Sequence, residues 1–403
     1  MEKESAGLLD VVVIGSGFAG VGMAIRLKMA GIRSFVVLEK ASSLGGTWRD
    51  NTYPGAACDI PTLLYSFSFA PNREWRYVYS PQAGILKYLE DCVEAYAVRD
   101  RFRFDSEVRE ASFDEEAATW LVRTTDGREY RSKCVVFAVG QLNRPAYPEI
   151  EGLATFGGKV FHSSQWDHDH KLEGRTVAVV GTGASAVQFV PEIAPLVSRL
   201  LLFQRSATWI GPKTERFRPW ERACLRSFPW LARALRLKMY WSIELGSGRY
   251  RKGTAQNDAV RQTTLDALDR DVADPDLRER LQPDYLPGCK RIPKSNDWFQ
   301  TLARDNIQLI SEPIQRAQED GIVTRDGVFH PCDTIIFATG FRATEFLSPI
   351  RVVGRDGVLL AETWREGAQA YKGVTVPSFP NMFILYGPNS NSHNSAVTSI
   401  ENQ

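Results

Sequence analysis

The chain has 403 residues, and its 49 Lys and Arg residues against 48 Asp and Glu residues give a formal net charge of +1. This balance excludes the strongly basic surface that would attract nucleic acid or an anionic membrane. Hydrophobic residues make up 43% and charged residues 24%, which is typical of a globular protein with room for two or three domains.

The N-terminal segment lacks the features of a signal peptide. It carries charges at Glu2, Lys3 and Glu4 in place of an apolar run. No stretch of the chain is long and apolar enough to span a bilayer. The six cysteines form no Cys-x-x-Cys pair, which is typical of a reducing compartment. We therefore expect a soluble, cytoplasmic protein without a transmembrane segment.

The first predicted element is a strand over 10–14, followed by the turn Gly15-Ser-Gly17-Phe-Ala-Gly20 and a helix over 21–30. With a second strand over 34–38, this order forms the βαβ pattern of a dinucleotide-binding domain. The three glycines permit a tight turn, close approach of a pyrophosphate and packing of helix on strand. The acid Glu39 ends the second strand, where it would accept a hydrogen bond from a ribose hydroxyl, so we expect FAD or NAD here.

The pattern occurs a second time further along the chain. A strand over 175–180 leads into Gly181-Thr-Gly183-Ala-Ser-Ala186, a helix to about residue 195 and a strand over 199–203. Ala186 is a permitted small residue at the third position. This strand ends at Gln204 and Arg205, and a guanidinium there would bind a 2′-phosphate, so we expect NADP. Two nucleotides in one chain indicate electron transfer from NADPH to a flavin. The alternative is that one of the two glycine turns binds no nucleotide.

Two further strands, over 133–139 and 334–338, each end in a turn of small residues. We expect the first to close the first half of the FAD domain and the second to return the chain to it. The predicted fold class is α/β, with two doubly wound dinucleotide-binding (Rossmann-like) domains and a helical insertion at about 212–285. The domains would be 1–149 for FAD, 150–332 for NADP, and 333–403 for the return segment of the FAD domain.

The predicted helical insertion is rich in Trp and Arg. Trp230, Ala234, Leu237, Trp241 and Leu245 recur at helical spacing. We expect this stripe to pack against the protein in preference to anchoring it to a membrane. Lining of a substrate entrance is a second interpretation.

The chain contains no dithiol of the kind that disulfide reductases use. Gly45-Gly46-Thr47 resembles the segment that precedes the redox cysteines of those enzymes, but Trp48 follows here and Cys58 has no neighbouring partner. A metal site is not expected either, since His162, His168 and His170 have no second group of candidate ligands. The dithiol chemistry of a disulfide reductase is therefore missing.

Several motifs together resemble the Baeyer–Villiger monooxygenases. Gly45–Trp48, Tyr53-Pro54-Gly55 and Asp59 are similar to the active-site loop of that family. Residues 156–167 resemble its fingerprint Phe-x-Gly-x3-His-x3-Trp-Pro/Asp, whose fixed positions here are Phe156, Gly158, His162, Trp166 and Asp167. Residues 288–291 and 379–389 also look like this family, and the resemblance runs from Asp10 to Gln403.

The resemblance implies an FAD- and NADPH-dependent enzyme that converts a small-molecule ketone and O2 into an ester or lactone through a flavin peroxide. Arg291 matches the catalytic arginine, whose permanent charge would stabilise the negative charge of the reaction. Asp59 would pair with Arg291, hold its position and sharpen hydride transfer, and Lys290 would help Arg205 to hold the 2′-phosphate. His162 is expected to be structural, at a linker between the domains. Without the resemblance, Asp59 and Arg291 would be interpreted as a turn residue and a surface charge.

The implied contacts divide between the two nucleotides. Those expected for FAD are Gly15, Gly17, Phe18, Ala19, Gly20, Glu39, Lys40, Thr47, Trp48, Asp59, Tyr65, Val108 and Val397. Those expected for NADP are Gly181, Thr182, Gly183, Ala184, Ser185, Ala186, Gln204, Arg205 and Lys290. Trp48 and Tyr65 could equally be aromatic residues of the core.

Two other functions remain open on the sequence alone. One is a related flavin monooxygenase that oxygenates amines or sulfides. The other is a remnant that oxidises NADPH without oxygenating a substrate, because the family usually continues past the position of Gln403. The particular ketone and the oligomeric state are not encoded in any motif.

Overall fold

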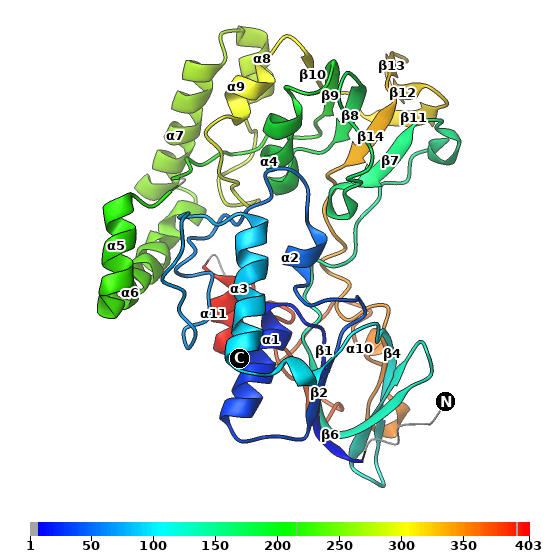
Figure 1. The fold of residues 1–403 in the computed structure, drawn as a ribbon. Helices are drawn as coiled ribbons and strands as arrows, with labels where there is room; N and C mark the ends of the chain where they lie inside the picture. Colours follow the sequence, from blue (N-terminus) through cyan, green and yellow to red (C-terminus); the bar gives the residue numbers. More distant parts are fainter. Residues whose placement is uncertain (1–6, 215, 392–393) are drawn as a thin grey trace.

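The computed structural model describes residues 7–214, 216–391 and 394–403. Its lower half in Figure 1 is built around an eight-stranded sheet in the order β15-β4-β5-β6-β1-β2-β3, with β16 also paired to β6. The strands of this sheet are β1 (Leu9–Ile14), β2 (Phe35–Leu38), β3 (Phe102–Arg103), β4 (Val108–Asp114), β5 (Thr119–Thr124), β6 (Glu129–Phe137), β15 (Arg351–Val353) and β16 (Met382–Ile384). β1 lies parallel to both β2 and β6.

β1 is apolar on both faces because each face of the sheet is covered. Val11 and Val13 point into a core shared with α1 (Phe18–Met29) and α3 (Gln82–Ala95). Val12 and Ile14 point into a second core that includes Trp120. Alternation of side chains along a strand produces this division, and it explains why the strand is a continuous hydrophobic run.

The upper half of Figure 1 holds a parallel five-stranded sheet in the order β10-β9-β8-β14-β7. Its strands are β7 (Lys159–His162), β8 (Thr176–Val180), β9 (Arg199–Phe203), β10 (Ile307–Ile310) and β14 (Thr334–Phe337). A small antiparallel sheet of β11 (Ile314–Gln318), β12 (Gly321–Thr324) and β13 (Phe329–Pro331) lies beside it. α4 (Ala184–Ile193) and α9 (Trp298–Leu302) pack over the parallel sheet. The predicted class, α/β with two doubly wound dinucleotide-binding units, is confirmed.

One strand lies in a different sheet from the one that we expected. We expected residues 334–338 in the return segment of the first unit, but β14 pairs with β7 and β8 in the second sheet. All four of its residues are buried, as is usual for a central strand of a parallel sheet that is covered on both faces. The return to the first unit therefore begins after β14, and β15 and β16 carry it out.

The helical insertion contains α5 (Pro219–Ser227), α6 (Pro229–Leu245), α7 (Ala255–Asp271) and α8 (Pro275–Arg280), within the predicted limits. The remaining helices are α2 (Thr47–Asp50), α10 (Leu360–Thr363), α11 (Ala396–Glu401) and the 3-10 turns η1 (Arg99–Arg101), η2 (Leu153–Thr155), η3 (Ser163–Gln165), η4 (Gly246–Tyr250) and η5 (Arg355–Gly357). No helix in the described ranges is both long and apolar enough to cross a membrane.

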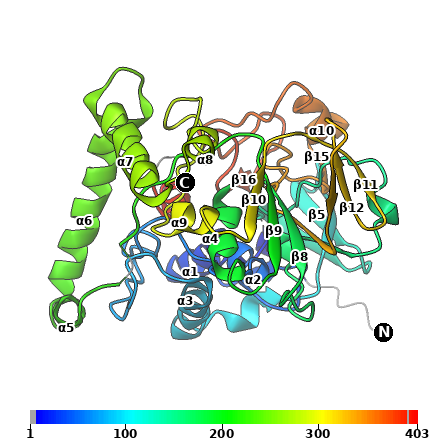
Figure 2. The ribbon, with the colours of Figure 1, turned by 90° about the horizontal axis from the view of Figure 1, so that it is seen from above.

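The packing face of α6 was predicted wrongly. Trp230, Leu237, Trp241 and Leu245 are 65%, 58%, 52% and 73% exposed, and α6 runs along the outer edge of the molecule in Figure 2. Ala232 and its neighbours on the opposite face pack on the first unit instead. Arg236 also turns inward, where its guanidinium donates to the carbonyl oxygen of Ser66 at 2.9 Å. Helical spacing identifies residues that share a face, but it does not say which face is covered.

Candidate active site

The first glycine turn joins β1 to α1 and leaves room for a ligand only on its outer side. A Cβ on Gly20 would lie 1.8 Å from the carbonyl oxygen of Gly15, so the helix packs directly on the turn. Gly17 is the N-cap of α1, and the N–H groups of the first helical turn have no intrahelical partners. These donors and the helix dipole suit the pyrophosphate of a dinucleotide.

Glu39 lies beside this turn with its carboxylate fixed in place. The side chain is 5% exposed, and its Oε2 accepts hydrogen bonds from the backbone N and the Oγ of Ser16 at 2.9 and 2.6 Å. Its Oε1 accepts from the backbone N of Ala41 at 3.0 Å and meets Arg49 Nη1 at 3.1 Å. The sequence motif predicts the role of Glu39, but it does not predict Ser16 and Arg49 as the partners of its carboxylate. Since the acid is already oriented at the end of β2, its position fits a ribose hydroxyl.

Aromatic side chains surround the same turn. Trp48 Nε1 donates to the hydroxyl of Tyr65 at 3.1 Å, and the ring of Phe18 packs edge-on against Tyr65 with centroids 4.9 Å apart. Burial raises the pKa of Tyr65, so the hydroxyl stays protonated. Thr47 begins α2 next to Trp48. These residues form a wall beside the cradle of the first nucleotide.

The other candidate FAD contacts lie in several elements around the turn. Lys40 is exposed at the end of β2, and Val108 is buried at the start of β4. The segment before β4 is held near Glu39, whose carbonyl oxygen accepts from the N of Ser106 at 2.8 Å. Ala19 lies in the first turn of α1, and Val397, on α11, is buried in the same core as Phe18.

The second glycine turn joins β8 to α4. Ala186 is fully buried, so the packing accommodates its methyl group where the first turn has glycine. Thr182 Oγ1 donates to the carbonyl oxygen of Ser206 at 3.0 Å, which ties the turn to the end of β9. Gly183 is the N-cap, and Ala184 and Ser185 begin the helix. The unpaired N–H groups at this end face outward as in the first unit.

Two cations lie at the end of β9. Arg205 is exposed, and Lys290 Nζ donates to Ser206 Oγ at 2.6 Å while lying 4.4 Å from the centroid of the Tyr285 ring. Gln204 is buried, and its amide donates to the carbonyl oxygen of Arg280 at 2.8 Å. Arg205 and Lys290 therefore fit a 2′-phosphate, whereas the amide nitrogen of Gln204 is already bound within the protein.

Asp59 and Arg291 come from the two different units and meet as an ion pair. Arg291 Nε lies 3.5 Å from Asp59 Oδ2, and the two side chains are 62% and 7% exposed. Burial raises the pKa of Asp59, and the positive charges of Arg291, Lys213 and Lys294 oppose this shift. The guanidinium of Arg291 is therefore exposed, whereas the carboxylate of Asp59 that it pairs with is buried.

The fingerprint segment is built into the second unit. Phe156 is buried beneath the sheet, and a Cβ on Gly158 would lie 2.2 Å from the carbonyl oxygen of Asp333. Trp166 packs on Phe189 of α4 at 5.2 Å between centroids, and Asp167 forms an ion pair with Lys159. These contacts give the segment a structural role in joining its strand to α4.

His162 ends β7 within this segment. It is fully buried, and its Nδ1 accepts from the N of Ser164 at 3.1 Å. Burial lowers the pKa of His162 to about 4. The imidazole is therefore neutral near pH 7, as suits a structural residue.

Gln188 contacts the loop that carries Asp59, although no sequence motif predicts it as a site residue. Its side-chain amide lies 3.5 Å from Asp59 Oδ1 and also binds Tyr53 and Ala57. Gln188 follows the second glycine turn by one helical turn, but no feature of the motif gives it a partner in the first unit. Only the packing of the two units brings these residues together.

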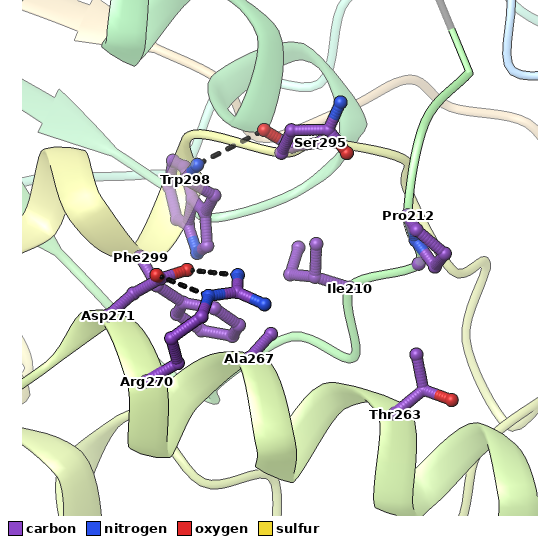
Figure 3. Close-up of a pocket in the computed structure, with 11 residues that line it drawn as sticks. Ile210, Pro212, Thr263, Ala267, Arg270, Asp271, Ser295, Trp298 and Phe299 are labelled. Atoms are coloured by element: carbon purple, nitrogen blue, oxygen red, sulfur yellow. Dashed lines mark hydrogen bonds and ion pairs between the residues drawn. The ribbon is translucent and has the colours of Figure 1, made fainter.

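Two surface pockets lie near this region. One follows the loop 53–57 and is lined also by Tyr77, Tyr79, Glu192 and Lys213. The other, shown in Figure 3, lies between α7, α9 and the segment 210–212, where Arg270 and Asp271 pair with each other at 2.7 Å. In the described residues no cluster of three or more His, Cys, Asp or Glu side chains could hold a metal ion.

Comparisons with known proteins agree with this geometry. Residues 12–242 match the family model for pyridine nucleotide-disulphide oxidoreductases. A Baeyer–Villiger monooxygenase of Streptomyces coelicolor is 45% identical over 98% of this chain and 76% of its own length, and one of Pseudomonas aeruginosa is 43% identical over 98% and 75%.

Solved structures give the same result. Cyclohexanone monooxygenase from Rhodococcus sp. Phi1 bound to NADP+ superimposes with a TM-score of 0.87 and 30% identity, covering 99% of this chain and 83% of that one. A steroid monooxygenase bound to NADP gives a TM-score of 0.85 and 33% identity, covering 97% and 83%. The chain therefore belongs to the Baeyer–Villiger monooxygenases, within the pyridine nucleotide-disulphide oxidoreductase family.

Proposed function

We propose that this chain is an FAD- and NADPH-dependent monooxygenase that converts a ketone into an ester or lactone, with Arg291 as the catalytic cation and Asp59 as its partner. The observation that carries the proposal is the ion pair between Asp59 of the first unit and Arg291 of the second, at 3.5 Å. A reaction that needs two nucleotides requires a centre where the two units meet. The names of the relatives support the same chemistry.

The two cradles divide the cofactors between them. FAD would lie on the N-terminus of α1, with its ribose at Glu39 and its ring system near Trp48 and Tyr65. NADPH would lie on the N-terminus of α4, with its 2′-phosphate at Arg205 and Lys290. When bound, NADPH supplies hydride to FAD, and the reduced flavin supplies activated O2.

Arg291 would stabilise the negative charge that develops on the carbonyl oxygen of the ketone. A guanidinium suits this role because it stays protonated at any working pH and its N–H groups form a planar fork. Asp59 meets the guanidinium at Nε, so the N–H groups on the Nη atoms can face the substrate. The carboxylate would hold the cation in position and balance its charge before the substrate binds. It would also assist hydride transfer from NADPH to the flavin, so the rate of flavin reduction reports on Asp59.

The substrate is proposed to be a small ketone, with O2 as the second substrate. The structural relatives are named for cyclohexanone and for a steroid, which supports a cyclic ketone as the first compound to test. We also propose a cytoplasmic location, since the six cysteines lie unpaired and a reducing compartment keeps them so.

The test compares Arg291→Ala with the conservative Arg291→Lys, and with Arg325→Ala as a control on an exposed arginine of the second unit. We expect Arg291→Ala to abolish ester formation from cyclohexanone while NADPH still bleaches the flavin absorbance without O2. Arg291→Lys should retain a small part of the activity, and Arg325→Ala should retain all of it.

Each other outcome identifies a different function. An unchanged ester yield in Arg291→Ala would exclude the role of Arg291. Oxygenation of sulfides or amines without any ester from the unmodified chain would indicate a heteroatom monooxygenase. Consumption of NADPH with an equal amount of H2O2 and no oxygenated product would indicate an uncoupled oxidase.

A further inference from the structure

The loop that carries Asp59 crosses from the core of one unit to the core of the other. Trp48 and Cys58 are buried in the core of the first unit, whereas Tyr53 and Ala56, which lie between them in the chain, are buried in the core of the second. The segment 53–57 is therefore an extension of the first unit that packs on the second. It ends two residues before Asp59.

The contact partner of this segment is α4. Gly55 has a φ of +75°, and a Cβ at this position would lie 2.6 Å from the carbonyl oxygen of Gln188, so the two backbones touch. The ring of Tyr53 packs edge-on against Phe189, with centroids 5.9 Å apart. The loop lies on the same helix whose N-terminus forms the second nucleotide cradle.

The side-chain amide of Gln188 fastens the loop with four hydrogen bonds. Its Oε1 accepts from the hydroxyl of Tyr53 at 3.0 Å and from the backbone N of Ala57 at 3.2 Å. Its Nε2 donates to the carbonyl oxygen of Ala57 at 3.0 Å and to Asp59 Oδ1 at 3.5 Å. An amide side chain has two donor hydrogens and two acceptor lone pairs, so its whole capacity is used.

These bonds also fix which way the amide faces. Ala57 offers one N–H and one C=O, and only one orientation of Gln188 can meet both. In that orientation the second hydrogen of Nε2 points to Asp59. The carboxylate of Asp59 is thus held on both sides, at Oδ1 by Gln188 and at Oδ2 by Arg291.

We infer that Gln188 is a positioning residue, which clamps the loop 53–59 to α4 and so keeps the carboxylate of Asp59 opposite Arg291. The inference rests on the proposed function, in which Arg291 and Asp59 form the catalytic pair. Gln188 lies one helical turn after Ala184, where α4 begins. The start of α4, where a nucleotide would bind, is thus separated from Asp59 by only one helical turn and the side chain of Gln188.

The first experiment is a double-mutant cycle on flavin reduction by NADPH without O2. The variants are Gln188→Ala, Asp59→Ala and the combination of both. Gln308→Ala is the matched control, because Gln308 lies in β10 of the same unit, away from the loop 53–59, and its side chain accepts a hydrogen bond from Arg199. We expect Gln188→Ala to lower the reduction rate about tenfold, as for loss of a hydrogen bond to a charged group. The affinity for NADPH should stay within about twofold, since Gln188 makes its four contacts with the loop.

The cycle separates this inference from the proposal that it rests on. If Gln188 acts through Asp59, Gln188→Ala should have no further effect once Asp59 is Ala. A full tenfold loss in that background, or a normal rate in Gln188→Ala alone, would overturn the inference and leave the proposed function standing. A normal rate in Asp59→Ala would instead refute the assignment of Asp59, and the inference with it.

Hydrogen exchange provides a second measurement that does not depend on activity. The backbone N–H of Ala57 donates to Gln188, so it should be protected in the unmodified chain and exchange faster in Gln188→Ala. Tyr53→Phe is the control, because it removes the other partner of Oε1 but leaves the bond from Ala57. Equal exchange at Ala57 in all three proteins would show that Gln188 does not clamp the loop.

Discussion

Gly55→Ala is the change that most directly tests the contact between the two units. A Cβ at Gly55 would lie 2.6 Å from the carbonyl oxygen of Gln188, a distance that real Cβ atoms essentially never show, and 3.0 Å from Glu192 Cγ. The backbone of α4 cannot yield locally, since its core side is buried. We therefore expect the loop 53–59 to lift away from the helix by at least a few tenths of an ångström, which would loosen the position of Asp59.

The magnitude follows from two contributions. Alanine at a positive φ costs about 1–2 kcal/mol relative to glycine, and forcing an extra carbon into a filled contact costs about 1–3 kcal/mol. Gly127→Ala separates the two, because Gly127 has a similar φ of +88° but no atom within 4 Å of the added Cβ. Gly127→Ala should therefore destabilise by about 1–2 kcal/mol, and Gly55→Ala by about 2–5 kcal/mol.

Two measurements check this prediction. The urea midpoint of unfolding, followed by tryptophan fluorescence, should fall further for Gly55→Ala than for Gly127→Ala. The rate of flavin reduction by NADPH should fall about tenfold in Gly55→Ala alone, because a misplacement on the order of 1 Å at a reacting centre can cost ~100-fold. Identical behaviour of the two variants in both assays would refute the packing of the loop on α4.

Three further predictions concern the nucleotide cradles and the linker. Arg205→Ala should raise the KM for NADPH by about 10- to 100-fold and leave that for NADH unchanged, since a charge-assisted bidentate contact is lost; equal effects on both would exclude a 2′-phosphate at Arg205. Glu39→Gln should lower the FAD retained after gel filtration, because one carboxylate oxygen becomes an NH2 group, which cannot accept from Ser16, Ala41 or a ribose; full retention would place the ribose elsewhere. His162 has a pKa lowered to about 4, so its stabilising contribution is present above pH ~6.5 and is lost as the pH falls towards 4, by ~3 kcal/mol at most. His162→Asn should flatten this part of the pH dependence of unfolding, and an unchanged slope would show that His162 does not titrate there.

Local patterns predicted the two βαβ units well, because each physical requirement lies within a short stretch of chain. β1, β2, β8 and β9 end within a residue or two of their expected positions. The glycine turns and the residues after the second strands are set by the shape of a dinucleotide, so their spacing is visible without a structure.

The failures concern contacts between distant segments. β14 lies between β7 and β8 in the second sheet, and nothing in residues 334–338 distinguishes one parallel sheet from another. The exposed stripe of α6 was also predicted wrongly because the covered face depends on contacts with distant segments. Its apolar residues and Arg236 occupy different faces of one helix, and the carbonyl groups of the loop 63–66 attract the guanidinium, which a periodicity cannot anticipate.

The candidate site combines both situations. Asp59 and Arg291 could be selected only by resemblance, since each is an ordinary charged residue in a loop, and Gln188 could not be selected at all. The reason is that no single unit contains the site: Asp59 belongs to the first, Arg291 to the second, and their separation depends on how the units pack. A fixed ion pair across such a boundary requires a contact that neither unit makes alone. The segment 53–57 makes that contact, because it belongs to the chain of the first unit but is buried in the core of the second. Gln188 makes the contact nearest to Asp59, since its amide binds both Ala57 and the Asp59 carboxylate.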